Sequence, residues 1–130
     1  MNTNDSAGGA RILLVEDEVL VRIFAVDALE DAGFSVEQAG TAADALQMLN
    51  NLPGVSAAVV DLGLPDRSGD QLAAEMRKLC AELPILIASG RSERELKDHF
   101  AGDGRVAILV KPYTASMLVE ALRSLGVSAS

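Results

Sequence analysis

Polar or charged residues follow four apolar stretches of the chain, and together they could carry out one kind of chemistry. Asp61 ends one apolar run, and the acidic pair Glu16-Asp17 ends an earlier one. Ser89 and Lys111 end two later runs. The carboxyl ends of parallel strands meet at one edge of a sheet, so these side chains would gather there. Carboxylates can hold a divalent cation, while a hydroxyl and an ammonium stabilise charge on a transferred phosphoryl group. The arrangement therefore predicts a phosphoryl-transfer site in which a carboxylate can act as the nucleophile.

Each of these signals has a common structural explanation when it is taken alone. Acidic residues after a strand usually cap a helix, and Asp61 could be a turn residue before Gly63. Ser89 could begin an ordinary turn, and Lys111 could be an ordinary surface lysine. Their occurrence at the ends of four different predicted strands is what favours a functional site.

A regular alternation of strand-like and helix-like segments surrounds these positions. Strands are expected at 11–15, 35–38, 57–60, 85–88 and 106–110. Helices are expected at 19–32, 41–50, 68–80, 92–100 and 114–125. Strand–helix units of this length predict an α/β fold with right-handed crossovers and a doubly wound parallel sheet.

The length and composition limit the class of protein. With 130 residues, of which 49% are hydrophobic, the chain is expected to form one domain with a buried core. We predict a packed domain at 11–126, between a flexible tail at 1–10 and a short tail at 127–130. No secretory signal is visible, and no apolar stretch approaches the roughly 18 residues that span a membrane. The single cysteine, Cys80, excludes an internal disulfide, and this composition fits a cytoplasmic location.

The charge pattern argues against two classes of partner. The formal net charge is −8, and the lysines and arginines form no run. Nucleic acids and anionic membranes require a basic surface, so neither is expected as a partner. The chain has three Phe, one Tyr and no Trp, which also disfavours a surface for base stacking.

The predicted helix at 19–32 carries two apolar stripes, although packing on a sheet requires only one. The stripe that is expected to face the sheet consists of Val21, Phe24, Ala25, Ala28 and Ala32. The second stripe consists of Val19, Ile23 and Val26. This second stripe is a scatter of surface hydrophobic residues, or is covered in part by a neighbouring helix, or is a docking surface for a partner helix.

The motifs at 12–18, 61–65, 88–90 and 111–113 resemble those of the receiver domains of response regulators in two-component signalling. The resemblance covers about residues 11–125 and depends on four motifs in a fixed order. It implies a (βα)₅ flavodoxin-like three-layer sandwich whose five-stranded parallel sheet has the strand order 2-1-3-4-5. It also implies a cis peptide bond between Lys111 and Pro112, which proline tolerates.

The resemblance implies a role for each position of the predicted site. Asp61 would be the phosphoacceptor, Ser89 would donate a hydrogen bond to the phosphoryl group, and Lys111 would pair with it. The implied cofactor is Mg²⁺, with Mn²⁺ as an alternative. Its implied ligands are Glu16, Asp17, Asp61 and the backbone carbonyl of Gly63.

The resemblance also implies partners. The phosphoryl donor would be a histidine kinase or a histidine phosphotransfer protein, which could dock on Val19, Ile23 and Val26. Output would pass through an unidentified protein, through phosphoryl relay or through a homodimer. Such a protein is not an enzyme in the usual sense, but it assists its own phosphorylation and its slow dephosphorylation. A free-standing regulator and the receiver of a hybrid kinase both fit the sequence.

One position departs from the family pattern, and two others have open roles. Ile108 stands where the family commonly has an aromatic side chain that turns inward on activation. A rearrangement of the segment at 89–105 is the alternative route for activation. Arg91 could shield the phosphoryl group or could be a solvated arginine, and His99 is expected to be a partly buried helix residue.

Three other functions compete with that of a phosphorylated receiver. An interaction module of receiver shape that works without phosphorylation would not need the acid, hydroxyl and lysine set. A phosphohydrolase with an aspartyl nucleophile would resemble the dehalogenase-like phosphatases, but these have an acid two residues after the nucleophile, where this chain has Gly63. A flavin or dinucleotide binder of the same topology would need a Gly-rich loop after the first strand, and the sequence has none there.

Overall fold

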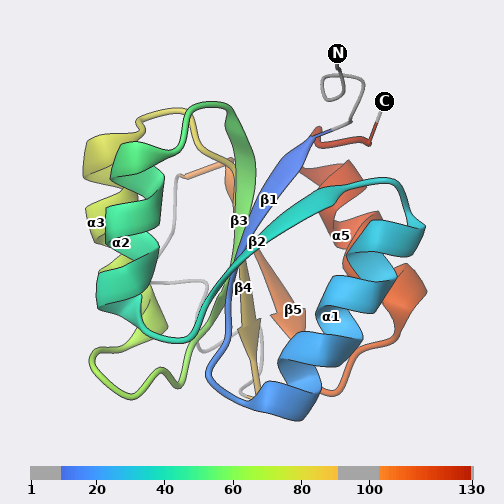
Figure 1. Ribbon diagram of the computed structural model, residues 1–130. Coiled ribbons are helices and arrows are strands. Elements are labelled where there is room, and N and C mark those ends of the chain that lie inside the picture. The colour runs from blue at the N-terminus through green and yellow to red at the C-terminus, as the bar shows by residue number, and fades with distance from the viewer. Residues whose placement is uncertain (1–9, 91–102, 130) are drawn as a thin grey trace.

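The computed structural model describes residues 10–90 and 103–129. The predicted helix at 92–100, together with Arg91 and His99, lies outside these residues, as does the tail up to residue 9. Within the described ranges, parallel strands form one sheet in the order β2-β1-β3-β4-β5 (Figure 1). The strands are β1 (Arg11–Val15), β2 (Ser35–Ala39), β3 (Val55–Asp61), β4 (Ile85–Ser89) and β5 (Val106–Val110). This topology confirms the predicted doubly wound α/β fold.

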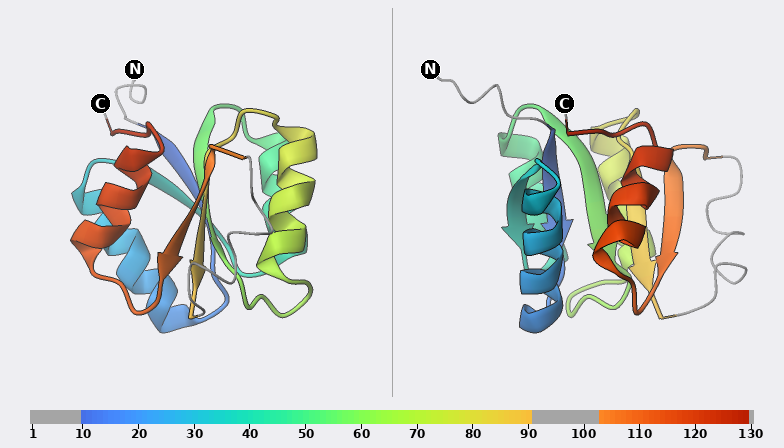
Figure 2. Two further views of the ribbon diagram at one scale, coloured as in Figure 1. Left: turned by 180° about the vertical axis from the view of Figure 1, so that it is seen from behind. Right: turned by 90° about the vertical axis from the view of Figure 1, so that its right-hand side faces the viewer.

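The helices of the described ranges cover both faces of the sheet. They are α1 (Val19–Asp31), α2 (Ala42–Asn51), α3 (Gly69–Leu79) and α5 (Ala115–Ser124). Helices α1 and α5 pack together on one face, and α2 and α3 pack together on the other (Figure 1, Figure 2). Strand β3 begins two residues before the predicted start, and the other boundaries agree with the prediction to within one residue. None of these helices is both long enough and apolar enough to span a bilayer.

The sheet is apolar on both faces because helices cover both. Side chains alternate between the two faces along a strand. Leu13 and Val15 of β1 pack towards α2 and α3, whereas Ile12 and Leu14 pack towards α1 and α5. This double burial explains the unbroken apolar run of β1. Each fully buried aliphatic side chain stabilises the fold by about 1.5–3 kcal/mol relative to an exposed one, so the two core layers hold the strand ends in place.

Helix α1 differs from the prediction in the side chains that it buries. Phe24 was expected against the sheet but is 43% exposed, and Leu29, which the predicted stripe left out, is fully buried. The buried side chains are Ala25, Ala28 and Leu29, at i, i+3 and i+4. Phe24 lies about 100° around the helix axis from Ala25. Its ring is therefore turned towards Tyr113, with the two ring centroids 6.0 Å apart.

The second stripe of α1 is covered only in part by the neighbouring helix α5. Val19 and Ile23 are exposed, but Val26 is half-buried against the core that α1 shares with α5. Leu20, which the prediction did not include, is 81% exposed. The exposed apolar side chains of α1 are therefore Val19, Leu20, Ile23 and Phe24, and we call this set the α1 apolar surface.

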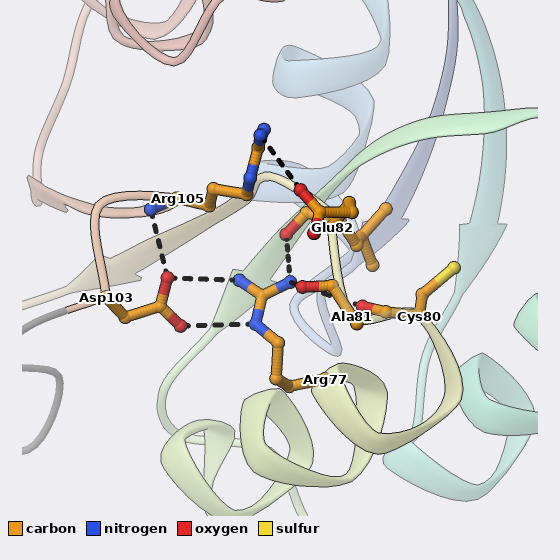
Figure 3. Close-up of polar contacts among 7 residues, drawn as sticks. Arg77, Cys80, Ala81, Glu82, Asp103 and Arg105 are labelled. Carbon is orange, nitrogen blue, oxygen red and sulfur yellow. Dashed lines mark hydrogen bonds and ion pairs between the residues drawn. The ribbon is translucent and has the colours of Figure 1, made fainter.

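Charged groups join three segments at the amino-terminal edge of the sheet (Figure 3). The guanidinium of Arg77, near the end of α3, donates hydrogen bonds to both carboxylate oxygens of Asp103, at 3.1 and 3.5 Å. It also donates to three backbone carbonyls of the loop at 80–83. Asp103 in turn accepts a hydrogen bond from the amide of Arg105, whose side chain pairs with Glu82. These contacts tie α3 to the starts of β4 and β5.

The chain after α5 folds back onto the domain. Gly126 has a φ of 85°, a conformation that favours glycine. The amide of Val127 donates to the carbonyl of Leu122 at 3.0 Å, and its side chain is buried in the core shared by α1 and α5. Core packing therefore continues past the predicted boundary at residue 126, to Val127 and to the half-buried Ala129.

Candidate metal centre and phosphoacceptor site

Backbone hydrogen bonds hold the two acidic segments at the carboxyl edge of the sheet. Strand β3 ends at Asp61, which pairs with Ala88 of β4. The pairing continues one residue further, because the amide of Leu62 donates to the carbonyl of Ala88 at 2.9 Å. The loop after β1 is held beside β2, because the amide of Glu16 donates to the carbonyl of Ala39 at 3.0 Å. The backbone that carries the acidic side chains is thus part of the sheet or is bonded to it.

Three carboxylates form the centre of the site. One oxygen from each of Glu16, Asp17 and Asp61 lies within 4.8 Å of the other two. Glu16 and Asp61 are only 2% and 6% exposed, and Asp17 is half-buried. Carboxylate oxygens gathered in this way suit Mg²⁺, which takes hard oxygen ligands and retains several waters. The structure brings these three acids together, and their donor set fits a divalent cation.

The ammonium of Lys111 neutralises part of this charge. Its Nζ lies 2.8 Å from Oδ1 of Asp61, 3.3 Å from Oε1 of Glu16 and 3.9 Å from Oε1 of Glu18. The amide of Lys111 donates to the carbonyl of Ser89 at 2.7 Å, which fixes the base of the lysine beside β4. Counted over the described part of the chain, the three carboxylates of the centre and the ammonium of Lys111 sum to two negative charges, which a divalent cation would balance.

Burial and charge shift the pKa values of two of these groups. Burial raises the pKa of the Glu16 carboxyl above 4.5, and the charge of Asp61 adds to this, while hydrogen bonds from the Glu18 amide and from Lys111 oppose it. Burial disfavours the charged form of Lys111. Its hydrogen bond to Asp61 and the charges of Asp61 and Glu16 outweigh burial, so the pKa of Lys111 is raised. Lys111 is therefore an ammonium at neutral pH.

The structure places the remaining predicted positions at or near the same edge. Ser89 is the last residue of β4 and is buried. A Cβ atom built on Gly63 would stand 4.0 Å from Oδ2 of Asp61, so the backbone of Gly63 lies close to the acceptor. The peptide bond between Lys111 and Pro112 is cis. Ile108 lies further back on β5, half-buried against the core on the side of α2 and α3.

Arg22 contacts the acidic loop, although the sequence did not single it out. Its Nη1 donates a hydrogen bond to the carbonyl of Glu16 at 2.8 Å. A Cβ atom on Gly40 would stand 3.1 Å from the same nitrogen, so glycine at that position leaves room for the guanidinium. Arg22 therefore fixes the backbone of the acidic loop from the α1 side.

An apolar groove of about 290 Å³ opens beside the site. It is lined by Leu20, Val21, Phe24, Lys111, Pro112 and Tyr113. Burial raises the pKa of the Tyr113 hydroxyl, and the charge of Glu16 raises it further, so this wall of the groove stays uncharged. The groove thus connects the α1 apolar surface with the lysine of the site.

The fold and the site together define the class of α/β domains that carry an acidic centre at the carboxyl edge of a parallel sheet. Within that class, the response regulator receiver domain family matches residues 12–123, and the chain belongs to that family. It is therefore a receiver of the two-component phosphorelay type. Receivers are phosphoacceptors, and their partners are histidine kinases or phosphotransfer proteins.

Individual relatives agree with this assignment. Sensor kinase CckA of Brucella abortus (strain 2308) is 31% identical over 122 residues, which make up 93% of this chain and 13% of that protein. Transcriptional regulatory protein PhoP of Escherichia coli O157:H7 is 34% identical over 116 residues, or 88% of this chain and 51% of that protein. The chain thus spans about half or less of the length of these relatives. The crystal structure of a CheY-like response regulator receiver domain protein from Methanospirillum hungatei JF-1 matches with a TM-score of 0.81 and 28% identity, covering 90% of this chain and 94% of that chain.

Proposed function

We propose that Asp61 accepts a phosphoryl group from a histidine kinase or a histidine phosphotransfer protein, and that Mg²⁺ is required. The observation that supports this most directly is the environment of the buried Asp61 carboxylate, which has two other carboxylates within 4.8 Å and an ammonium at 2.8 Å. The bound metal would supply positive charge beside the phosphoryl oxygens. Its proposed ligands are Glu16, Asp17, Asp61 and the carbonyl of Gly63, with Mn²⁺ as an alternative ion.

In the proposed reaction, a carboxylate oxygen of Asp61 attacks the phosphorus of the donor's phosphohistidine. A P–O bond forms and the P–N bond breaks, and the electron pair of that bond leaves with the imidazole nitrogen of the donor. Lys111 pairs with the phosphoryl oxygens, and the hydroxyl of Ser89 donates a hydrogen bond to one of them. Water later attacks the phosphorus of the acyl phosphate, which releases inorganic phosphate and restores the carboxylate.

The proposed docking surface for the donor is the α1 apolar surface together with the groove beside it. The side chains of this surface are exposed on the helix that follows the acidic loop, and the groove extends to Lys111. A donor helix that packs on these side chains would bring its phosphohistidine towards Asp61. Val26 is not part of the proposed surface, because it is half-buried against the core.

The first test is the intact mass of the protein after incubation with acetyl phosphate, with and without Mg²⁺. We expect one phosphoryl adduct that requires Mg²⁺ and is absent from Asp61→Asn. The control is Asp27→Asn, which removes an exposed carboxylate of α1 and should leave the adduct unchanged. An adduct that persists in Asp61→Asn would place the acceptor at another residue. No adduct with acetyl phosphate, and none with phosphorylated kinases, would favour an interaction module that works without phosphorylation.

The docking surface is tested separately, by phosphotransfer from a phosphorylated histidine kinase. Leu20→Glu introduces a charge into the α1 apolar surface and should slow this transfer, while modification by acetyl phosphate stays unchanged. The matched control is Leu79→Glu, since Leu79 is 50% exposed but lies on α3, on the opposite face of the sheet. Equal transfer rates for the two variants would remove the α1 apolar surface from the proposal.

A further inference from the structure

The loop at 62–68, between β3 and α3, carries the proposed carbonyl ligand Gly63 and is fastened at both ends. The amide of Leu62 donates to a carbonyl of β4 at 2.9 Å, and the amide of Gly69 donates back to the carbonyl of Leu62 at 2.8 Å. A Cβ atom on Gly69 would stand 2.7 Å from the carbonyl oxygen of Asp61. The start of α3 therefore packs directly against the end of the acceptor strand.

The middle of this loop is fastened by Asp66, which caps a helix from another part of the chain. Oδ1 of Asp66 accepts a hydrogen bond from the amide of Ala42 at 2.9 Å, and Oδ2 accepts one from the amide of Ala43 at 3.0 Å. These are the first two amides of α2, which have no acceptor within the helix. The helix has a second cap of its own, because Oγ1 of Thr41 accepts from the amide of Asp44 at 3.1 Å. The start of α2 is thus capped once by its own segment and once by the loop that carries Gly63.

The charge of Asp66 suits this contact. The hydrogen bonds from the Ala42 and Ala43 amides lower the pKa of Asp66, so its carboxylate form is the one that is bound at neutral pH. The amino end of α2 also carries the partial positive charge of the helix dipole. The carboxylate uses both oxygens, and two hydrogen bonds to neighbouring amides restrict the orientation of the loop as well as its position.

We propose that Asp66 is a positioning residue for the metal centre, which holds the loop at 62–68 against α2 and so keeps the carbonyl of Gly63 beside Asp61. The inference rests on the proposed function, because it takes Gly63 to be a metal ligand. A backbone carbonyl has no rotamers with which to compensate for a displaced loop, so its place depends on the backbone alone. The side chain of Leu64 packs in the core and holds the loop by apolar contact. Asp66 holds it by hydrogen bonds, which also depend on orientation.

Mg²⁺ binding and the hydrogen bonds of Asp66 must affect each other equally, because two linked equilibria share one coupling free energy. If Asp66 steadies a metal ligand, bound Mg²⁺ steadies the hydrogen bonds that Asp66 accepts. Amide hydrogen exchange at Ala42 and Ala43 should therefore slow when Mg²⁺ is added. The amide of Leu52, at the other end of α2, is the internal reference, and its exchange should not change.

The test compares the Mg²⁺ affinity of the wild type, Asp66→Ala and Thr41→Ala by isothermal titration calorimetry with MgCl₂. Both substitutions remove a cap from the same helix end, but only Asp66→Ala releases the loop. Loss of a group that orients a metal ligand typically weakens affinity by about 10–100-fold, and Asp66 acts through several residues, so we expect a Kd about three to ten times higher for Asp66→Ala. Thr41→Ala should bind Mg²⁺ like the wild type. Asp66→Asn keeps one acceptor oxygen and should lie between the two.

Equal Mg²⁺ affinity of Asp66→Ala and Thr41→Ala, whether unchanged or weakened, would overturn the inference and leave the proposed function intact. Unchanged exchange at Ala42 and Ala43 on addition of Mg²⁺ would overturn it as well. If the wild type does not bind Mg²⁺, the proposed metal centre fails and the inference fails with it. Thermal unfolding shows which variants are folded at the temperature of the titration. If Asp66→Ala is unfolded, Asp66→Asn is compared with Thr41→Ala in its place.

Discussion

Asp61→Asn should raise the free energy of unfolding of the metal-free protein, even though Asp61 is an ion-pair partner of Lys111. The charge of Asp61 is repelled by two carboxylates, Glu16 and Asp17, and attracted by one ammonium. Asparagine has nearly the same shape and can still accept a hydrogen bond from Lys111. Lys111 also keeps Glu16 as a partner at 3.3 Å. The substitution therefore removes repulsion without leaving a buried charge unpaired.

The size of the effect follows from the distances. At an effective dielectric constant of about 20, charges within 4.8 Å repel by at least about 3.5 kcal/mol per pair, or about 7 kcal/mol for both neighbours of Asp61. On the same scale, the attraction between Asp61 and Lys111 at 2.8 Å is about 6 kcal/mol. Repulsion thus exceeds attraction by about 1 kcal/mol, which favours asparagine. The cost of burying a charged carboxylate favours asparagine further. We therefore expect Asp61→Asn to be more stable than the wild type by about 1–2 kcal/mol.

Urea unfolding at neutral pH in the presence of EDTA measures this difference. Asp27→Asn removes an exposed carboxylate of α1 and controls for net charge, and its unfolding free energy should stay within about 0.5 kcal/mol of the wild type. Mg²⁺ at ten times its Kd should stabilise the wild type by about 1.4 kcal/mol, and should stabilise Asp61→Asn less, because the variant lacks one ligand. A variant that is less stable than the wild type in EDTA would refute the reasoning, since the ion pair with Lys111 would then outweigh the repulsion.

Three further predictions concern single positions. Gly69→Ala places a Cβ atom 2.7 Å from the carbonyl oxygen of Asp61, so urea unfolding should show a loss of about 1–3 kcal/mol and acetyl phosphate should modify the variant more slowly. Burial raises the pKa of Glu16 above 4.5, so calorimetry should show Mg²⁺ binding weaken as the pH falls through that raised value. Over the same interval the metal-free fold should gain stability, because the folded state then binds the proton more tightly than the unfolded chain does; Glu16→Gln should remove this gain in stability. Thr114→Ala removes the acceptor of the Met117 amide at 3.1 Å, and should cost about 1 kcal/mol in urea unfolding with no change in Mg²⁺ affinity.

The site at the carboxyl edge could be predicted from the sequence because it depends on topology more than on packing. Once alternating apolar runs are assigned to parallel strands, the residue that ends each run lies at one edge of the sheet. Glu16, Asp17 and Asp61 do meet there, and Lys111, the residue after β5, reaches Asp61. The order of the strands, in contrast, came from the resemblance to a known family, because apolar periodicity alone does not say which strands are neighbours.

The rotation of α1 about its axis could not be predicted in the same way. Its apolar residues form more than one stripe, and the stripe that is buried depends on α5, which packs beside α1 but lies far along the chain. This is why Phe24 was assigned to the buried face and Leu29 was left out. Arg22 and Asp66 went unrecognised for a related reason. Each acts through a backbone group of another segment, and the local pattern around either residue contains no signal of that contact.

Charged groups serve opposite purposes at the two edges of the sheet. At the amino edge, Arg77 and Asp103 balance each other one to one, and Nη1 of the guanidinium also donates to backbone carbonyls. At the carboxyl edge, within the described ranges, Lys111 pairs with Asp61 and Glu16, and the third carboxylate of the centre, Asp17, adds a negative charge. The electrostatic state of the carboxyl edge can therefore change while neutral pairing at the amino edge keeps the starts of β4 and β5 in register. The charges that maintain the fold therefore lie at one edge of the sheet, and the charges that a bound cation or phosphoryl group would change lie at the other.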